Sequence, residues 1–440
     1  MSCDDWLDKT PKDRLYPDVY FKTEDELRLF TNQFYNNLVP SAVDIYSESS
    51  DLIVKSDLML EMSGQRIIPD EGNGWNFTAL RDINFYLQYS HNCTEVNARN
   101  RYDGVARFFR AYFYFEKVKR YGDIPWYDKA LDSDDPELYK ARDSREFVMQ
   151  KMLEDLDFAI ANLPKTKNAY VLTRWTALAL KSRVCLFEGT FRKYHGLEDC
   201  EKYLNACVSA SETFMNESGY TLYKSGSTPY RDLFASINLQ ADEVIFGRDY
   251  EASLSVLHNV QNYENSTTMG RPGMNKKIVN SYLMADGSRF TDKAGYETMT
   301  FDQECQNRDP RLAQTIRTPG YTRIGSTKKE APNLAYTMTG YHLIKYSMTA
   351  NYDEYNKSCN DIPLFRTAEV YLNFAEAKAE LGTLKQADIN KSIKLLRDRV
   401  GMTNLDMELA NSKPDPYLMS AATGLSLIHI SEPTRLRRIS

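Results

Sequence analysis

Residues 104–127 read GVARFFRAYFYFEKVKRYGDIPWY, and this stretch decides the fold expected for the chain. Apolar side chains recur there at the i, i+3, i+4, i+7 spacing of an α-helix, at Val105, Phe108, Phe109, Tyr112, Phe115 and Val118. More aromatic residues fill the flanks, so we expect the helix to be enclosed on most sides. Gly122 adopts left-handed geometry at little cost, and Pro125 cannot continue a helix. The sequence therefore predicts a buried helix that ends at Gly122 and leaves as a fixed, extended segment.

The composition indicates an ordered globular chain. It has 440 residues, 42% of them hydrophobic and 12% aromatic, with a formal net charge of −6. No basic stripe occurs, so nucleic acid is not expected as a partner. No apolar run approaches the ~18 residues of a membrane span. The 30 tyrosines exceed ordinary usage, and a ring with a polar tip suits half-wet surfaces such as sugar or peptide sites.

Helix-start and helix-stop residues predict several further helices. The expected helices cover about residues 23–38, 75–87, 95–121, 144–163, 173–189, 197–215, 365–381 and 389–400. Thr23 and Glu26 form a capping box for the first helix. Ala177 and Ala179 allow two helices to approach closely, as in tetratricopeptide hairpins. We therefore expect a mainly α fold with a scaffold of tetratricopeptide-like helical hairpins.

The interval of about residues 217–361 differs in composition from the helical parts. It is rich in Gly, Thr, Asn and Tyr, and one strand-like run occurs at residues 243–248. The pieces MADG at residues 284–287 and RDPRL at residues 308–312 stand out within it. These features predict an irregular, loop-rich lobe with short strands. Residues 41–76 are likewise expected to form loops and short strands.

Several segments resemble the SusD/RagB family of surface glycan-binding lipoproteins. The aromatic helix with its GDIPWY exit is similar to the central signature of that family. The other matching pieces are WNFTALRDIN at residues 75–84, MADG, RDPRL and IPLFRTAE at residues 362–369. The resemblance covers about residues 3–418. It implies a lipoprotein tether at residues 1–22, a helical region at 23–216, the irregular lobe at 217–361 and a C-terminal helical hairpin at 362–418.

The two ends of the chain carry separate expectations. In a protein similar to SusD, Cys3 would become the acylated N-terminus after cleavage of an upstream lipoprotein signal, and Asp4 and Asp5 resemble an export tag. The alternative is an ordinary cytosolic N-terminus with a chance cysteine. Residues 425–440 resemble translated sequencing-adapter sequence, so we treat them as a non-native tail and exclude them from functional reasoning.

The resemblance implies capture of an oligosaccharide and its delivery to a TonB-dependent, SusC-like transporter of the outer membrane. Two alternatives stay open, which are peptide capture by the same architecture, as in RagB-like relatives, and a soluble tetratricopeptide adaptor. Catalysis is not expected, because the sequence contains no GxSxG, P-loop, HExxH or GxGxxG motif. No cofactor or metal is expected. The acidic run at residues 132–137 is interpreted as a solvated loop in preference to a calcium site.

Three residues are the first candidates for ligand contacts. Sugars stack their C–H faces on aromatic rings and accept hydrogen bonds from planar polar side chains. Trp75 follows a Gly-Asn-Gly turn at an expected helix entrance, and Arg81 and Asn84 lie further along the same helix. Trp75 could instead be a core residue that seats the helix. In that case Tyr263 and Tyr296 in the lobe are the next candidates.

Overall fold

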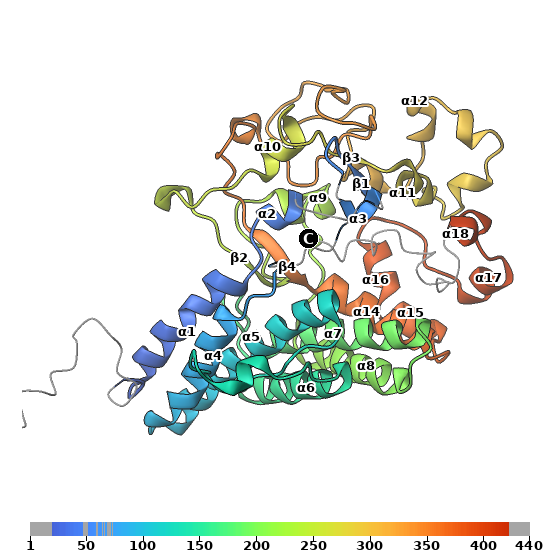
Figure 1. Cartoon of the computed structure of the whole chain (residues 1–440). Coiled ribbons are helices and arrows are strands. Elements are labelled where there is room, and N and C mark those ends of the chain that lie inside the picture. Colours follow the sequence, from blue (N-terminus) through green and yellow to red (C-terminus); the bar gives the residue numbers. More distant parts are fainter. Residues whose placement is uncertain are drawn as a thin grey trace, which may run out of the picture. The chain divides into compact units, whose positions relative to one another are not determined.

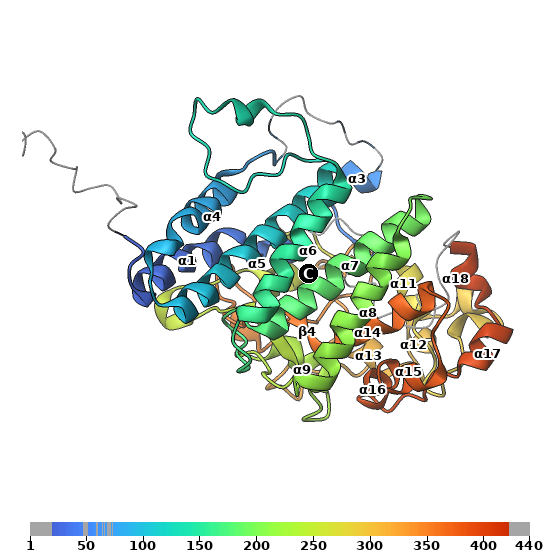
Figure 2. The same cartoon turned by 90° about the horizontal axis from the view of Figure 1, so that it is seen from below.

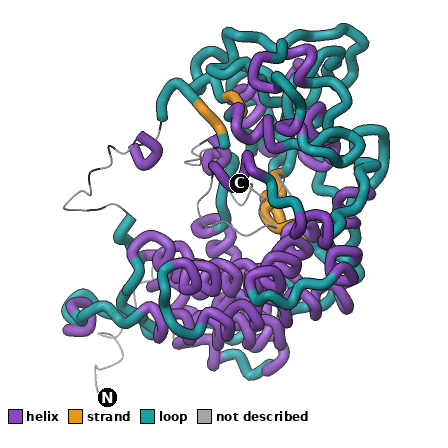
Figure 3. Tube along the Cα trace, turned by 90° about the vertical axis from the view of Figure 1, so that its right-hand side faces the viewer, coloured by secondary structure: helices purple, strands orange, loops and turns teal. Residues whose placement is uncertain are grey.

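The computed structural model describes most of the chain as two compact units. The described residues are 20–46, 52–58, 60–63, 65, 67, 72 and 74–421. The first unit combines residues 1–39 with 71–164, and the second combines 40–70 with 165–440. Cys3, most of the expected tether, Asn73 and the expected non-native tail lie outside the described residues. The predicted mainly α fold is confirmed, since helices dominate and strands are short (Figures 1 and 3).

Four long helices make up most of the first unit. They are α1 (Glu24–Leu38), α4 (Thr78–Tyr89), α5 (Val96–Tyr121) and α6 (Arg145–Asn162), with the 3-10 helices η3 (Ser90–Asn92) and η4 (Pro136–Tyr139) between them. The helix α5 packs against the other three (Figures 1 and 2). The predicted capping box at α1 is confirmed, because the Thr23 hydroxyl accepts from the Glu26 amide and the Glu26 carboxylate accepts in return.

The predicted aromatic helix is α5, and it ends as expected. Gly122 follows its last residue with a φ of 71°. Most rings along the helix are buried, and Phe109 is only 1% exposed. Tyr114 stacks on Trp126 of the exit segment with ring centroids 4.3 Å apart, and the Tyr114 hydroxyl accepts a 2.6 Å hydrogen bond from the Tyr127 amide. These two contacts fix the direction in which the chain leaves the helix.

The second unit contains a hairpin of long helices. The helices α7 (Arg174–Tyr194) and α8 (Cys200–Glu217) pack together, and α14 (Thr367–Glu380) packs on both. The expected stop of α7 near Gly189 is wrong. Gly189 lies inside the helix, where an added Cβ would come within 2.7 Å of the Leu204 side chain on α8. This glycine permits a close helix approach and does not end the helix.

Two expectations near the C-terminus are also corrected. The helix expected from about residue 365 begins at Thr367 as α14, because residues 362–366 pair antiparallel with β2 (Val244–Arg248) as the strand β4 (Ile362–Arg366). The expected helix at 389–400 is broken into α15 (Gln386–Asn390) and α16 (Ile393–Asp398). The Ser392 hydroxyl donates to the Asp388 carbonyl at 2.6 Å, a local bond that competes with helix continuation. Two short helices follow, α17 (Met407–Ser412) and α18 (Pro416–Ala421).

The rest of the second unit consists of short elements joined by loops. Its helices are α2 (Val43–Tyr46), α3 (Leu60–Ser63), α9 (Pro229–Ala235), α10 (Val260–Asn265), α11 (Lys276–Ser281), α12 (Phe301–Glu304) and α13 (Pro310–Ala313). Its 3-10 helices are η5 (Ala252–Leu254), η6 (Phe290–Asp292), η7 (Tyr296–Thr298) and η8 (Ala350–Tyr352). The strand predicted at 243–248 is confirmed as β2. A second antiparallel pair joins β1 (Ile53–Val54) to β3 (Gly273–Met274).

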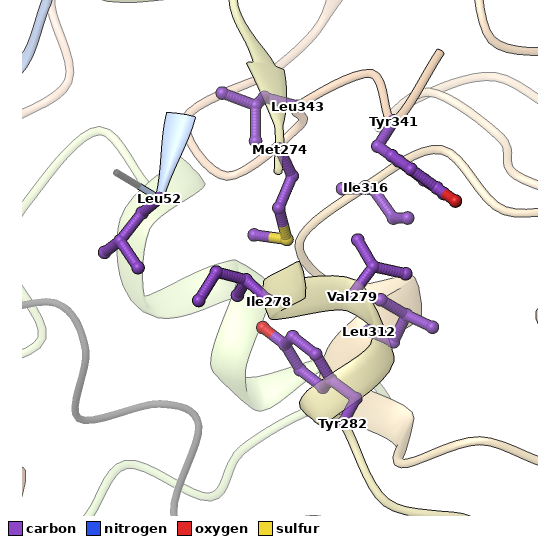
Figure 4. Close-up of a cluster of buried hydrophobic side chains, with 9 residues drawn as sticks. All are labelled: Leu52, Met274, Ile278, Val279, Tyr282, Leu312, Ile316, Tyr341 and Leu343. Carbon is purple, nitrogen blue, oxygen red and sulfur yellow. The ribbon is translucent and has the colours of Figure 1, made fainter. Parts of the chain in front are cut away.

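One apolar cluster gives this irregular part a core of its own. Its buried members are Leu52, Met274, Ile278, Val279, Tyr282, Leu312, Ile316, Tyr341 and Leu343 (Figure 4). They come from β3, α11, α13 and the adjoining loops, and their side chains point toward one another. The lobe predicted from composition is thus a packed structure. The domain boundaries expected at residues 216 and 361 stay predictions.

Candidate functional site

A pocket of about 280 Å³ lies beside the start of α4 in the first unit. Its lining residues are Trp75, Phe77, Thr78, Leu80, Arg81, Asn84, Tyr127, Lys129, Leu131 and Leu138. Most of this surface is aromatic or aliphatic, and a few polar groups converge on it. That combination is typical of sites for small ligands. The structure brings the candidates Trp75, Arg81 and Asn84 together here, which the sequence could only suggest.

Trp75 stands on the rim of the pocket and not in the core. Its side chain is 40% exposed. The helix α4 begins at Thr78 and not at Trp75 as expected, because the Asn76 side chain accepts from the Thr78 amide at 2.8 Å and the preceding residues form a turn. The indole is held edge-on by Phe77 and Tyr121, with ring centroids 5.3 and 4.9 Å away. Trp75 is therefore a partly exposed ring on a braced rim.

Two cations brace the turn that carries Trp75. The Arg142 guanidinium lies over the indole, 4.9 Å from its centroid. Lys117 of α5 donates a hydrogen bond to the Gly74 carbonyl and lies over the Phe113 ring. Burial lowers the pKa of Lys117, and the nearby Arg120 lowers it further. Arg142 covers part of the indole and so restricts which face of the ring a ligand can reach.

Arg81 joins the helix to the opposite wall of the pocket. Its Nε donates to the Leu131 carbonyl at 3.1 Å, and its side chain remains 56% exposed. The Asp132 carboxylate lies 3.8 Å from the guanidinium, a weak contact between exposed groups. The planar guanidinium therefore retains donors that a ligand in the pocket could use.

Asn84 holds the pocket together from beneath. It is 1% exposed, and its amide donates to the carbonyls of Tyr127 at 2.8 Å and Lys129 at 3.3 Å. Its Oδ1 accepts from Arg110, which binds Asp155 through two bonds of 2.6 and 2.7 Å. Burial alone would lower the pKa of Arg110, but the hydrogen bonds and charge of Asp155 outweigh it, and the pKa is raised. Asn84 is thus placed to position the loop, with its polar atoms already engaged.

The loop after Tyr127 forms the wall that sequence reasoning missed. Lys129 within it binds Glu137 at 2.9 Å and Asp135 at 3.6 Å, so part of the acidic run is engaged in ion pairs. Within the described part of the chain, no three His, Cys, Asp or Glu side chains are grouped so as to hold a metal ion. The contacts between α4 and this loop span 43 to 50 residues. The fixed GDIPWY exit was the one local signal that pointed to it.

The two candidates in the lobe do not line this pocket. Tyr263 lies in α10 and is 2% exposed. Its ring is therefore too buried to stack on a ligand at the surface, which argues against the proposed contact. Tyr296 lies in η7 and is half-buried. Its ring stands edge-on to Phe290 and Tyr417, with centroids 5.8 and 6.2 Å away.

The fold and the pocket together define a class, a helical-hairpin protein with a loop-rich part and an aromatic surface pocket. Comparison with protein families gives two matches. The family described as SusD family matches residues 233–428, and the family described as starch-binding associating with outer membrane matches residues 65–174. The chain belongs to the SusD/RagB family.

Individual relatives agree with this assignment. SusD-like protein P2 of Formosa agariphila is 24% identical, over 93% of this chain and 81% of the relative. A crystal structure of a SusD-like protein from Bacteroides fragilis matches with a TM-score of 0.73 and 21% identity, covering 97% of this chain and 88% of that one. A SusD-like carbohydrate binding protein from the same species matches with a TM-score of 0.75 and 18% identity, covering 95% and 85%. At these identities the structures support the fold alone.

Proposed function

We propose that this chain is a cell-surface lipoprotein of the outer membrane that binds an oligosaccharide in the Trp75 pocket and delivers it to a TonB-dependent, SusC-like transporter. The observation that carries the proposal is the exposed, braced Trp75 ring beside the partly exposed Arg81. Its support from relatives is the starch-binding family description and the carbohydrate-binding title of one structural neighbour.

The chemistry of the pocket suits a sugar. An indole offers a flat apolar face to the C–H groups of a pyranose ring. A guanidinium offers planar donors to neighbouring hydroxyl groups. The volume of about 280 Å³ is at the small end of ligand pockets, which span roughly 300–1,000 Å³. We therefore expect the pocket to grip a short stretch of a glycan whose remainder stays in solvent.

The residues around the pocket favour binding over cleavage. Glycoside hydrolysis ordinarily needs two carboxyl groups that flank the scissile bond. Among the described residues that line the pocket, none is Asp, Glu, His or Cys. The proposed role is therefore capture of the glycan without chemical change.

Attachment to the membrane is proposed to occur through lipid at Cys3. The helices that the structure describes include none that is long and apolar enough to cross a bilayer. A single acyl chain binds membranes only marginally, whereas two or more anchor stably. With a lipoprotein signal placed upstream, Cys3→Ala should release the protein from membranes on carbonate washing. Retention of the Cys3→Ala variant in washed membranes would contradict lipid attachment at Cys3. Repeated purifications in detergent that recover no barrel protein would contradict the proposed transporter partner.

The binding proposal is tested by titration calorimetry with a panel of neutral and acidic oligosaccharides. Trp75→Ala should abolish binding, while the melting temperature stays within about 2 °C because the ring is partly exposed. Tyr139→Ala is the matched control, since Tyr139 is 86% exposed in the same unit and does not line the pocket. Undiminished affinity in a folded Trp75→Ala variant would sink the proposal. Binding of peptides but of no oligosaccharide would favour the peptide alternative.

A further inference from the structure

A second cavity, in the loop-rich part of the second unit, has a cationic floor. Its volume is about 490 Å³. Arg317 and Arg323 line its inner side, and each is only 5% exposed. Lys328, Asn333 and Tyr336 line its more accessible parts. Nothing in the proposed capture at Trp75 makes use of this cavity.

Each of the two buried arginines is paired with one carboxylate that also lines the cavity. Both guanidinium groups donate to the same neutral oxygen, Asn265 Oδ1, at 2.7 and 3.1 Å. Their ion-pair partners are Glu330 and Asp353, each 3.0 Å away, with side chains 28% and 30% exposed. Carboxylates that face water are screened more than the arginines beneath them. The Nε atoms of Arg317 and Arg323 are buried and have no hydrogen-bond partner among the described residues.

The surroundings add further positive charge. Arg231 lies behind the floor and donates to the Tyr321 hydroxyl at 3.2 Å. Against these cations stands the buried Glu264, which accepts from the Tyr346 amide and from Ser347. Together with Lys328, the neighbourhood therefore carries four cationic side chains against three carboxylates.

The behaviour of a neighbouring histidine agrees with this excess. Burial and then the charge of Arg317 lower the pKa of His342 to about 3. The ring is held neutral, because its Nδ1 accepts from the Asn333 amide at 3.2 Å and its Nε2 donates to the Glu264 carbonyl at 2.8 Å. Burial disfavours any charge, whereas the part of the pKa lowering that comes from Arg317 and Arg323 reflects a positive potential at the ring.

We propose that this cavity binds the anionic group, a carboxylate or a sulfate, of an acidic saccharide. Lys328 is exposed at the cavity and forms no ion pair with any described residue, so its ammonium is available to the anion. Tyr336 stands edge-on to His342, with centroids 6.0 Å apart, and its half-buried ring provides a wall for the sugar. The inference rests on the proposed function in that the ligand is a saccharide, and it narrows the captured class to charged glycans.

The test uses the full chain, with an oligogalacturonate, a sulfated galactose oligosaccharide and a neutral oligosaccharide as probes. Calorimetry at low salt should show binding of at least one anionic probe that weakens as salt is added. Lys328→Gln should lower the affinity of that probe about fivefold, the scale of one partly exposed charge contact. Lys329→Gln removes the same charge one residue away from a position that does not line the cavity, and it should leave the affinity unchanged.

The outcomes separate this inference from the Trp75 proposal. Binding of one anionic probe only would name the group that the cavity prefers. Equal losses in the Lys328 and Lys329 variants, or no preference for anionic over neutral probes, would overturn the inference. Undiminished affinity for the anionic probe in Trp75→Ala, together with a loss of affinity in Lys328→Gln, would overturn the Trp75 proposal and leave this cavity standing. In the bound state the Nε–H resonances of Arg317 and Arg323 should shift.

Discussion

The helical core around α5 and the loop-rich part of the second unit differ in how their buried backbone oxygens are paired. In α5 the backbone groups satisfy one another within the helix, so the side chains are free to be apolar. Phe109 shows the result, with rings of Phe34, Tyr35 and Phe108 around it at 6.1, 5.0 and 5.5 Å. Here the core is built from rings.

In the loop-rich part, buried arginines take over the role of a hydrogen-bond ladder. Arg308 donates to the carbonyls of Glu304, Val279 and Tyr282 at 2.7, 2.6 and 2.8 Å and lies 3.8 Å from the Phe290 centroid. Buried backbone oxygens must be paired, and irregular loops pair fewer of them with backbone amides than a helix does. Burial lowers the pKa of Arg308 to about 10, so it stays charged at neutral pH. The comparison teaches that buried cations can pair backbone oxygens of the loop-rich part where no helix supplies an amide.

The largest effect should come from emptying the ring-built core. Phe109→Ala removes an aromatic ring that is 1% exposed, and we expect a loss of about 4 kcal/mol in unfolding free energy. Phe147→Ala on α6 is the control, because Phe147 is 40% exposed. Urea denaturation measures both variants. Similar losses for the two would show that ring burial is not what stabilises the first unit.

Breaking one buried ion pair tests how much buried arginines stabilise the loop-rich part. Arg311 and Asp309 of the RDPRL segment are paired at 2.6 Å with fully buried side chains. Asp309→Asn removes the charge of a carboxylate that two nitrogens of the Arg311 side chain contact in a fully buried site, so we expect a loss of about 3 kcal/mol. Hydrogen exchange should increase first around α13 and not in α5. Asp302→Asn, at an exposed position of α12, is the control, and an equal effect there would contradict the special role of the buried pair.

Acid should weaken the loop-rich part before the α5 core. Burial lowers the pKa of His258 to about 4 and of His342 to about 3, whereas an unfolded histidine titrates near about 6.5. The unfolded chain therefore binds more protons between these values. The stability is complete above pH ~6.5 and is lost as the pH falls toward the folded pKa values, by about 2 kcal/mol for each histidine at about pH 5.

Variants of the histidines make this prediction specific. His342→Gln keeps a neutral donor and acceptor and should reduce the pH dependence of unfolding measured by calorimetry. His91→Gln changes an exposed histidine of the first unit and should leave the dependence as it was. Unaltered acid sensitivity in His342→Gln would argue against a buried neutral imidazole as its source.

The smallest effect concerns the hairpin of α7 and α8. Gly189→Ala would place a Cβ 2.7 Å from the Leu204 side chain and 3.1 Å from its backbone nitrogen. Overpacking of this kind costs ~1–3 kcal/mol, whereas alanine gains roughly 0.5–1 kcal/mol over glycine inside a helix, so we expect a net loss of about 1 kcal/mol. Gly196→Ala has open space but a φ of 65° and tests strain alone. A stabilised Gly189→Ala variant would show that α7 and α8 can accommodate the added methyl group without a steric clash.

Local signals explain which parts of the fold could be predicted. The cap at Thr23 and the stop at Gly122 act on their immediate neighbours, so the local sequence is enough to predict where these two helices begin and end. Gly189 was misread because a glycine that ends a helix and one that admits a neighbouring helix look alike in sequence. The contacts of Arg308 with the Val279 and Tyr282 carbonyls join residues 29 and 26 positions apart, and no periodicity in the sequence predicts them.

The same distinction applies to the pocket. The aromatic residue Trp75 and the turn before it predicted a ligand contact at the entrance of a helix. The task of Asn84 could not be deduced, because its partners Tyr127 and Lys129 lie 43 and 45 residues away. Arg110 and Asp155, which fix its amide, belong to α5 and α6. Only the folded chain shows that a predicted contact residue is engaged in positioning.

The grip of α4 on the pocket loop has a consequence for how such a protein can be retargeted. Asn84 and Arg81 hold the loop by main-chain oxygens, which every amino acid supplies. These contacts therefore do not depend on which side chains the loop displays. Substitutions at Lys129 and Leu138 would change the lining of the pocket and leave the main-chain contacts of Asn84 and Arg81 in place. The main-chain contacts of Asn84 and Arg81 hold the loop, while the side chains at Lys129 and Leu138 can vary. A library of substitutions at these two positions would therefore keep the contacts that hold the loop.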